Sequence, residues 1–137
     1  MVDVGGAPLL VVAAALLRDR RVLVQQRPAG KELAGLWEFP GGKLELGETA
    51  EIALSRELRE ELGIDVTVDA MRPVTFATGS AGPRPLVLLL YRIEAWAGEP
   101  QALEASALAW ADEAGLRSLP MPPADAPLID ALTPWLG

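Results

Sequence analysis

The residues of this chain that could do chemistry are three glutamates in one short acidic stretch. Glu57, Glu60 and Glu61 are separated by three and four residues, so on a helix their carboxylates lie on or near one face. Like charges at that spacing destabilise an isolated helix by about 0.2–0.5 kcal/mol per pair. A divalent cation such as Mg²⁺, which prefers oxygen ligands, would explain the clustering. An ordinary solvated helix face is the alternative.

The composition leaves few other kinds of active site. The 137 residues include no cysteine and no histidine, which excludes a thiolate nucleophile, a Cys- or His-ligated metal and a Ser-His-Asp triad. With 19 acidic and 12 basic residues the net charge is −7, which argues against binding to polymeric nucleic acid. The longest apolar run, residues 9–17, is too short to span a bilayer and follows no cationic segment. We therefore expect a cytoplasmic protein with no membrane partner.

A helix over residues 49–62 would position the glutamates. Leu54, Leu58 and Leu62 recur every four residues and form an apolar stripe. Thr49 is a suitable N-cap, and Gly63 is a suitable residue for ending the helix.

Apolar runs and turn residues indicate a sheet around this helix. Strands are expected at residues 9–17, 22–27, 36–39, 64–68, 74–78, 86–96 and 107–111. The first two read as a hairpin, Pro40-Gly41-Gly42 ends the third, and residues 127–136 read as a closing helix. The sequence therefore predicts one mixed α/β (α+β) domain over residues 1–137, with a curved sheet.

The spacing around the glutamates is more specific than the helix alone. Gly42 is followed after five residues by Glu48, and after seven more by Arg-Glu-apolar-any-Glu-Glu-any-Gly-apolar, which ends at residue 64. This pattern over residues 42–64 resembles the Nudix hydrolase signature without a departure. The weaker similarity from residue 11 to about residue 132 resembles the MutT-type branch, which includes 8-oxo-dGTP diphosphatase and CTP pyrophosphohydrolase relatives.

The resemblance implies a fold and a chemistry. Nudix enzymes have an α/β/α sandwich with a curved mixed sheet, and with Mg²⁺ or Mn²⁺ they hydrolyse nucleoside diphosphates linked to another moiety. By position in the motif, the implied metal ligands are Gly41 (through its carbonyl), Glu57, Glu60 and Glu61. Arg56 matches the arginine that orients the catalytic glutamates, and Glu48 would pack against it. In such enzymes the cations polarise phosphate oxygens and water, and a carboxylate takes the proton.

Two residues are candidates for that proton acceptor. Glu57 belongs to the motif itself. Glu104 lies in a segment after Trp96 that resembles the MutT region supplying a late glutamate; an exposed loop acid is its other reading. Both stay open from the sequence.

Five residues outside the motif resemble a MutT-type nucleotide site. Arg27 and Arg84 match arginines near the phosphate and the nucleotide, although each could be a surface arginine. Glu38 and Phe39 precede the Gly-Gly turn; Phe39 would line the base pocket or join the core. Asp125 stands where MutT carries an asparagine that reads the oxidised guanine. Its other reading is a helix N-cap.

That aspartate bears on the substrate. An asparagine amide donates and accepts hydrogen bonds, whereas an ionised aspartate only accepts, which suits the exocyclic amine of cytosine. The resemblance therefore implies a nucleoside triphosphate pyrophosphohydrolase that releases a monophosphate and pyrophosphate. Clean-up of oxidised purines such as 8-oxo-dGTP is the first expectation, and CTP or dCTP hydrolysis is the alternative. A non-catalytic nucleotide-binding module is the reading from another class. A monomer or homodimer is expected.

Overall fold

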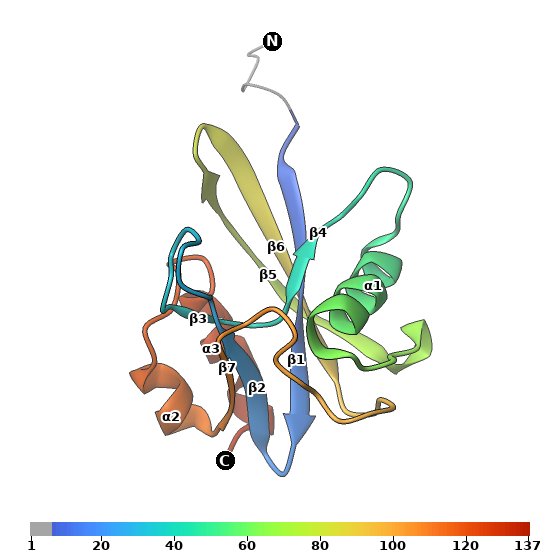
Figure 1. Cartoon of the computed structure of the whole chain (residues 1–137), viewed down its shortest axis with the longest axis vertical. Coiled ribbons are helices and arrows are strands. Elements are labelled where there is room, and N and C mark those ends of the chain that lie inside the picture. Colours follow the sequence, from blue (N-terminus) through green and yellow to red (C-terminus); the bar gives the residue numbers. More distant parts are fainter. Residues whose placement is uncertain (1–6) are drawn as a thin grey trace.

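The computed structural model describes residues 7–137, so the first six residues of the predicted domain lie outside it. Seven strands of the described chain form one mixed sheet (Figure 1). They are β1 (Leu9–Arg18), β2 (Arg21–Gln26), β3 (Trp37–Glu38), β4 (Gly41–Lys43), β5 (Met71–Ala81), β6 (Arg84–Ile93) and β7 (Ala107–Ala111).

Strand β1 joins the two halves of the sheet. It pairs in parallel with β6 from Leu9 to Leu16, and on its other edge it pairs antiparallel with β4. The hairpin with β2 is present, but only Leu17 and Arg18 pair across it. Beyond that point β2 turns away and pairs with β3 and β7. The long antiparallel pair of β5 and β6 completes the half on the far side of β1.

Helices cover both faces of this sheet (Figure 1). They are α1 (Ala50–Leu62), α2 (Glu113–Ser118) and α3 (Ala126–Leu132), with short 3₁₀ turns η1 (Val68–Ala70) and η2 (Thr133–Trp135). Because strand side chains alternate between faces, Val12 and Leu16 of β1 pack in the core beneath α1, while Ala13 and Leu17 pack beneath α2 and α3. The predicted α/β/α sandwich with a mixed sheet is confirmed.

The helix that carries the glutamates begins and ends where the sequence predicts. The Thr49 hydroxyl accepts a hydrogen bond from the Ile52 N–H. Gly63 adopts the left-handed conformation, with φ 71°, and its N–H donates to the Arg59 carbonyl. Leu54 and Leu58 are fully buried against the sheet, which fixes the rotation of α1 about its axis.

Three expectations about the elements are wrong. Residues 64–68 form no strand, although Ile64 and Val66 are buried core residues. An isolated bridge between Asp65 and Ala97 is the backbone pairing found for this segment in the described residues. The third strand does end before the Gly-Gly pair, but the pair forms the strand β4 rather than a turn, because it pairs with β1. Glycine is required there, since a side chain at Gly41 would overlap the Val12 carbonyl oxygen.

The closing helix is also shorter than predicted. It ends at Leu132 because Pro134 lacks the N–H that would continue it, and η2 follows. The six-residue α2 was not predicted. Within residues 7–137, no helix combines the length and apolar character needed to cross a membrane.

Candidate active site

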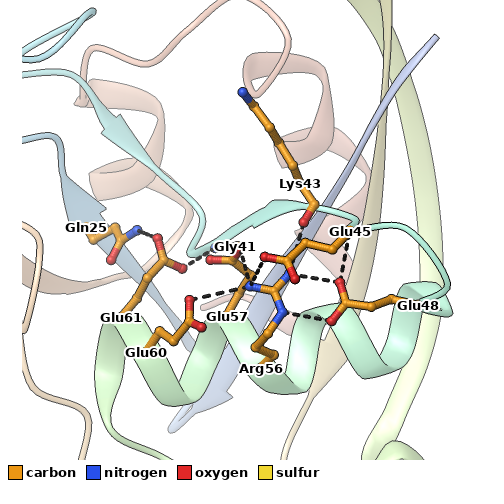
Figure 2. A network of polar contacts seen from close by, with 9 residues as sticks. All are labelled: Gln25, Gly41, Lys43, Glu45, Glu48, Arg56, Glu57, Glu60 and Glu61. Atoms are coloured by element: carbon orange, nitrogen blue, oxygen red, sulfur yellow. Dashed lines mark hydrogen bonds and ion pairs between the residues drawn. The ribbon is translucent and has the colours of Figure 1, made fainter. Parts of the chain in front are cut away.

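Arg56 is the centre of the polar network between α1 and β4 (Figure 2). Its Nε and Nη2 donate to the two carboxylate oxygens of Glu48, at 2.7 and 2.9 Å, in a fork-to-fork arrangement. Its Nη1 donates to Glu57 at 3.0 Å and to Glu60 at 3.4 Å, and Nη2 also reaches the Lys43 carbonyl. Hydrogen bonding to Arg56 lowers the pKa of Glu48 to about 2. Arg56 therefore fixes the end of β4 and the carboxylate of Glu57 together.

Glu61 is held on the inner side of the same helix. Its Oε1 accepts from the Gln25 side-chain amide at 3.1 Å, and its Oε2 accepts from the Gly41 N–H at 3.0 Å (Figure 2). The residue is only 8% exposed. Burial raises the pKa of Glu61 to about 8, and the charges of nearby carboxylates, Glu57 among them, add to the rise. A buried carboxylate of this kind favours a nearby positive charge.

Gly42 makes room for Glu57. A Cβ atom at Gly42 would lie 2.5 Å from the Cδ and Oε1 atoms of the Glu57 carboxylate, a distance that real Cβ atoms do not show. Burial raises the pKa of Glu57, while the hydrogen bond from Arg56 opposes the rise. The glycine spacing in the motif therefore has a steric reason at the carboxylate itself.

The donor set fits a hard divalent cation. Glu57, Glu60 and Glu61 supply only oxygen atoms, and their mutual repulsion would be relieved by a cation. Within residues 7–137, however, no three acidic side chains are gathered around one point. Glu57 and Glu60 instead point toward Arg56, so a cation would have to draw these oxygens together.

A cleft of about 550 Å³ runs from this network to the opposite helical layer. Its lining includes Glu61, Gly41 and Gly42. Phe39 and Asp125 also line it. Phe39 belongs to the core under α3, as one of its two predicted readings has it, and its place in a base pocket stays a prediction.

Asp125 lies at the start of α3 but does not cap it. Its side chain makes no capping hydrogen bond, although its carbonyl accepts from the Leu128 N–H. The residue is 8% exposed and faces the cleft. Burial raises its pKa to about 7; the charge of Glu38 adds to the rise, and the Phe39 N–H and Arg27 oppose it. The carboxyl group is therefore available to a ligand in the cleft.

Arg27 and Glu38 form an ion pair between two cavities. Nη1 of Arg27 donates to both Glu38 oxygens, at 3.2 and 3.1 Å, and its Nε donates to the Glu32 carbonyl. Burial raises the pKa of Glu38, and Arg27 opposes the rise. Both residues line the cleft and also a second cavity of about 460 Å³.

Glu104 and Arg84 have different positions relative to the site. Glu104 lines the second cavity together with Glu61, because the Leu103 N–H ties its loop to the Glu61 carbonyl. Arg84 lies outside the lining of both cavities, and its guanidinium donates to the Ala7 carbonyl. The structure thus brings Glu104 to the carboxylates but does not bring Arg84 there.

Several residues that line the two cavities were not predicted from the sequence. Gln25 lines the second cavity, and Lys43 and Thr78 line the cleft. Gln25 had a signal, since it is a polar residue that directly follows the buried run Val22–Val24 in β2.

Comparison with known proteins gives consistent results. The sequence profile described as NUDIX domain matches residues 8–132. The CTP pyrophosphohydrolase of Escherichia coli K12 is 43% identical over 88% of this chain and 88% of its own length. The putative 8-oxo-dGTP diphosphatase 2 of Mycobacterium tuberculosis is 43% identical over 85% of this chain and 82% of its own length. The crystal structure of a MutT NUDIX hydrolase from Burkholderia pseudomallei superposes with a TM-score of 0.81, at 30% identity, over 92% of this chain and 98% of that one.

Proposed function

Since this chain belongs to the NUDIX domain family and is a hydrolase of phosphorus anhydrides, we propose that it cleaves nucleoside triphosphates to the monophosphate and pyrophosphate. Nudix hydrolases generally use divalent metal ions, and here we propose Mg²⁺, with Mn²⁺ as a substitute. The observation that carries the proposal is the single cleft that joins Glu61 and the Gly41–Gly42 turn to Phe39 and Asp125.

The lining of the cleft suits the two parts of a nucleotide. Asp125 supplies a polar group and Phe39, although mostly buried, an apolar one, as a nucleobase requires. Gly41 and the carboxylates of Glu57, Glu60 and Glu61 would hold the cation against the phosphates. Bound there, the cation would neutralise phosphate oxygens and lower the pKa of water.

The remaining residues of the site would orient a catalytic carboxylate, accept the proton from water and contact a phosphate. Arg56 would keep Glu57 in place through its contacts with Glu48 and β4. Glu57 and Glu104 are the candidate proton acceptors; burial raises the pKa of Glu57, which makes it a better base than an ordinary glutamate. A phosphate group would compete with Glu38 for Arg27.

The base preference depends on Asp125. We propose oxidised guanine nucleotides such as 8-oxo-dGTP as substrates, in line with the name of the Mycobacterium tuberculosis relative. Cytidine triphosphates are the second candidate, because Asp125 and Glu38 give the base end of the cleft acceptor character, and the Escherichia coli relative is named for CTP. Arg84 stays a predicted nucleotide contact that the structure does not support.

A nucleotide panel tests this proposal. The protein with Mg²⁺ is incubated with 8-oxo-dGTP, dGTP, CTP and dCTP, and pyrophosphate and orthophosphate release are measured separately. We expect pyrophosphate release, with 8-oxo-dGTP or the cytidine nucleotides preferred over dGTP. The Glu61→Gln variant is the inactive control. Release of orthophosphate only, or no hydrolysis of any of the four, contradicts the proposal.

A further inference from the structure

Within residues 7–137, one buried side-chain polar atom lacks a hydrogen-bond partner, and it is Oε1 of Gln25. Gln25 is only 4% exposed. Buried polar atoms without partners are rare in folded proteins because water is lost and nothing replaces it. The unsatisfied atom therefore calls for an explanation at this position.

The strand explains why a glutamine at this position reaches the active site. Val22 and Val24 of β2 pack beneath α2 and α3, whereas Leu23 packs beneath α1. Gln25 is two residues beyond Leu23 and so points to the same side. There its Nε2 donates to Oε1 of Glu61.

Glu61 also fixes which way round the amide lies. When Glu61 is ionised, as a metal-binding carboxylate is, its oxygens only accept, so the NH₂ end of Gln25 faces it and the reverse orientation would set two acceptors against each other. The other oxygen of Glu61 accepts from the Gly41 N–H. Oε1 of Gln25 is thereby turned away from Glu61.

The second cavity does not reach this oxygen. Gln25 lines the cavity together with Glu61 and Glu104, but its Oε1 atom is closed to water-sized molecules. The protein therefore keeps a buried, unsatisfied oxygen beside Glu61, while the other end of the same amide donates to Glu61. Unsatisfied buried polar groups destabilise a fold by about 1–3 kcal/mol, so their retention is explained by a function of the group that carries them.

We propose that Gln25 is a positioning residue for hydrolysis: its NH₂ group fixes the carboxylate of Glu61, a proposed metal ligand, although this leaves its own buried oxygen without a partner. This inference rests on the proposed function and adds to it a residue outside the signature. Gln25 would act through Glu61, without touching the nucleotide.

Three variants separate the positioning of Glu61 from a packing role of Gln25. Gln25→Met has similar length but removes both the donor and the acceptor. Gln25→Glu keeps an acceptor oxygen and removes the donor to Glu61. Leu23→Met is the matched control, since it places the same side chain on the same face of β2, one pleat away from the cavity.

The first readout is cation binding without nucleotide, measured by calorimetric titration with Mn²⁺. Gln25→Met is expected to weaken Mn²⁺ binding by about tenfold, which is the lower end of the loss of affinity seen when residues that orient metal ligands are replaced. Its melting temperature without cation is expected to change little, because removal of the unpartnered oxygen offsets loss of the donor to Glu61. Gln25→Glu is expected to melt lower than the wild type without Mn²⁺ and to gain more from adding it, since it brings another carboxylate next to Glu61. Leu23→Met binds Mn²⁺ as the wild type does.

The second readout is the separation of kcat from KM. Gln25→Met should lower kcat by about 10- to 100-fold with KM for the nucleotide within twofold of the wild type, because Gln25 contacts no part of the substrate. Retention of Mn²⁺ affinity and kcat within twofold in Gln25→Met, or equal losses in Leu23→Met, overturns the inference. The Mn²⁺ titration needs no substrate. A wild type that hydrolyses no nucleotide therefore refutes the proposed function, while unchanged Mn²⁺ binding in Gln25→Met refutes the role of Gln25.

Discussion

Replacing Asp125 by asparagine should change how stability depends on pH. In the folded protein burial raises the pKa of Asp125 from an ordinary value of 3.8 to about 7. The folded state therefore holds this proton more tightly than the unfolded state does, so the free energy of unfolding falls as the pH rises from about 4 to about 7. A rise of about three pKa units corresponds to about 4 kcal/mol, which is lost in full above pH 7. Asp125→Asn removes this loss.

The groups that surround Asp125 set the size of the effect. Glu38 on β3 raises its pKa, while Arg27 on β2 and the Phe39 N–H lower it. Lys43 and Glu61 line the same cleft. All of these groups remain in the Asp125→Asn variant, so the comparison with the wild type at each pH reports the change at position 125, including its coupling to Glu38.

Urea unfolding followed by tryptophan fluorescence measures the difference. Asp125→Asn should be more stable than the wild type by a few kcal/mol at pH 8 and by little at pH 4.5. The matched control is Asp130→Asn, also in α3, whose carboxylate is exposed and pairs with Arg117; it should show no such pH-dependent gain. If wild type and Asp125→Asn keep a constant difference from pH 4.5 to 8, Asp125 is not a buried acid with a raised pKa.

The remaining predictions concern the carboxylates and the cation. Glu61→Gln should lower turnover by orders of magnitude with little change in melting temperature, because the amide oxygen can still accept from a backbone N–H; wild-type turnover would refute the metal-site assignment. Gly42→Ala should displace the Glu57 carboxylate and reduce kcat at least tenfold, in steady-state assays. Arg56→Lys should reduce kcat by about 10- to 100-fold, because an ammonium cannot form the paired contacts with Glu48. Chelation by EDTA should abolish turnover and weaken nucleotide binding in calorimetry, and tight binding without cation would contradict the proposed role of the metal.

The parts of the fold that depend on local sequence could be predicted. The helix α1, its Thr49 cap and its Gly63 end follow from a period of four and from residues with known terminal preferences. The short strand β4 could not be predicted, because its pairing with β1 depends on how closely Gly41 approaches a strand about thirty residues earlier. For residues 64–68 the alternating pattern predicted a strand, but the alternating burial of Ile64 and Val66 arises with a single isolated bridge and no strand.

The residues of the candidate site also differ in whether local sequence predicts them. Glu57, Glu60 and Glu61 could be identified because fixed spacing along one helix sets their relative positions. The position of Gln25 directly after the buried run Val22–Val24 is a local signal. Its contact with Glu61 and the ion pair of Arg27 with Glu38 join separate segments, and no local pattern reports those contacts. Arg84 had the right residue type for a phosphate, but its position at the start of β6 places its guanidinium against Ala7.

The alternation of β1 between the two helical layers has a consequence for how such an enzyme could change its substrate. The carboxylates of α1 lie on one side of this strand, whereas Asp125 and the loop before α3 lie on the other. Mutations at well-separated positions usually have additive effects. Glu38 is the group that the two sides share, because its charge acts on both Asp125 and Glu61. Under the proposed function, substitutions in the segment 120–125 that leave Glu38 in place would therefore alter which base is accepted with little effect on the hydrolytic groups.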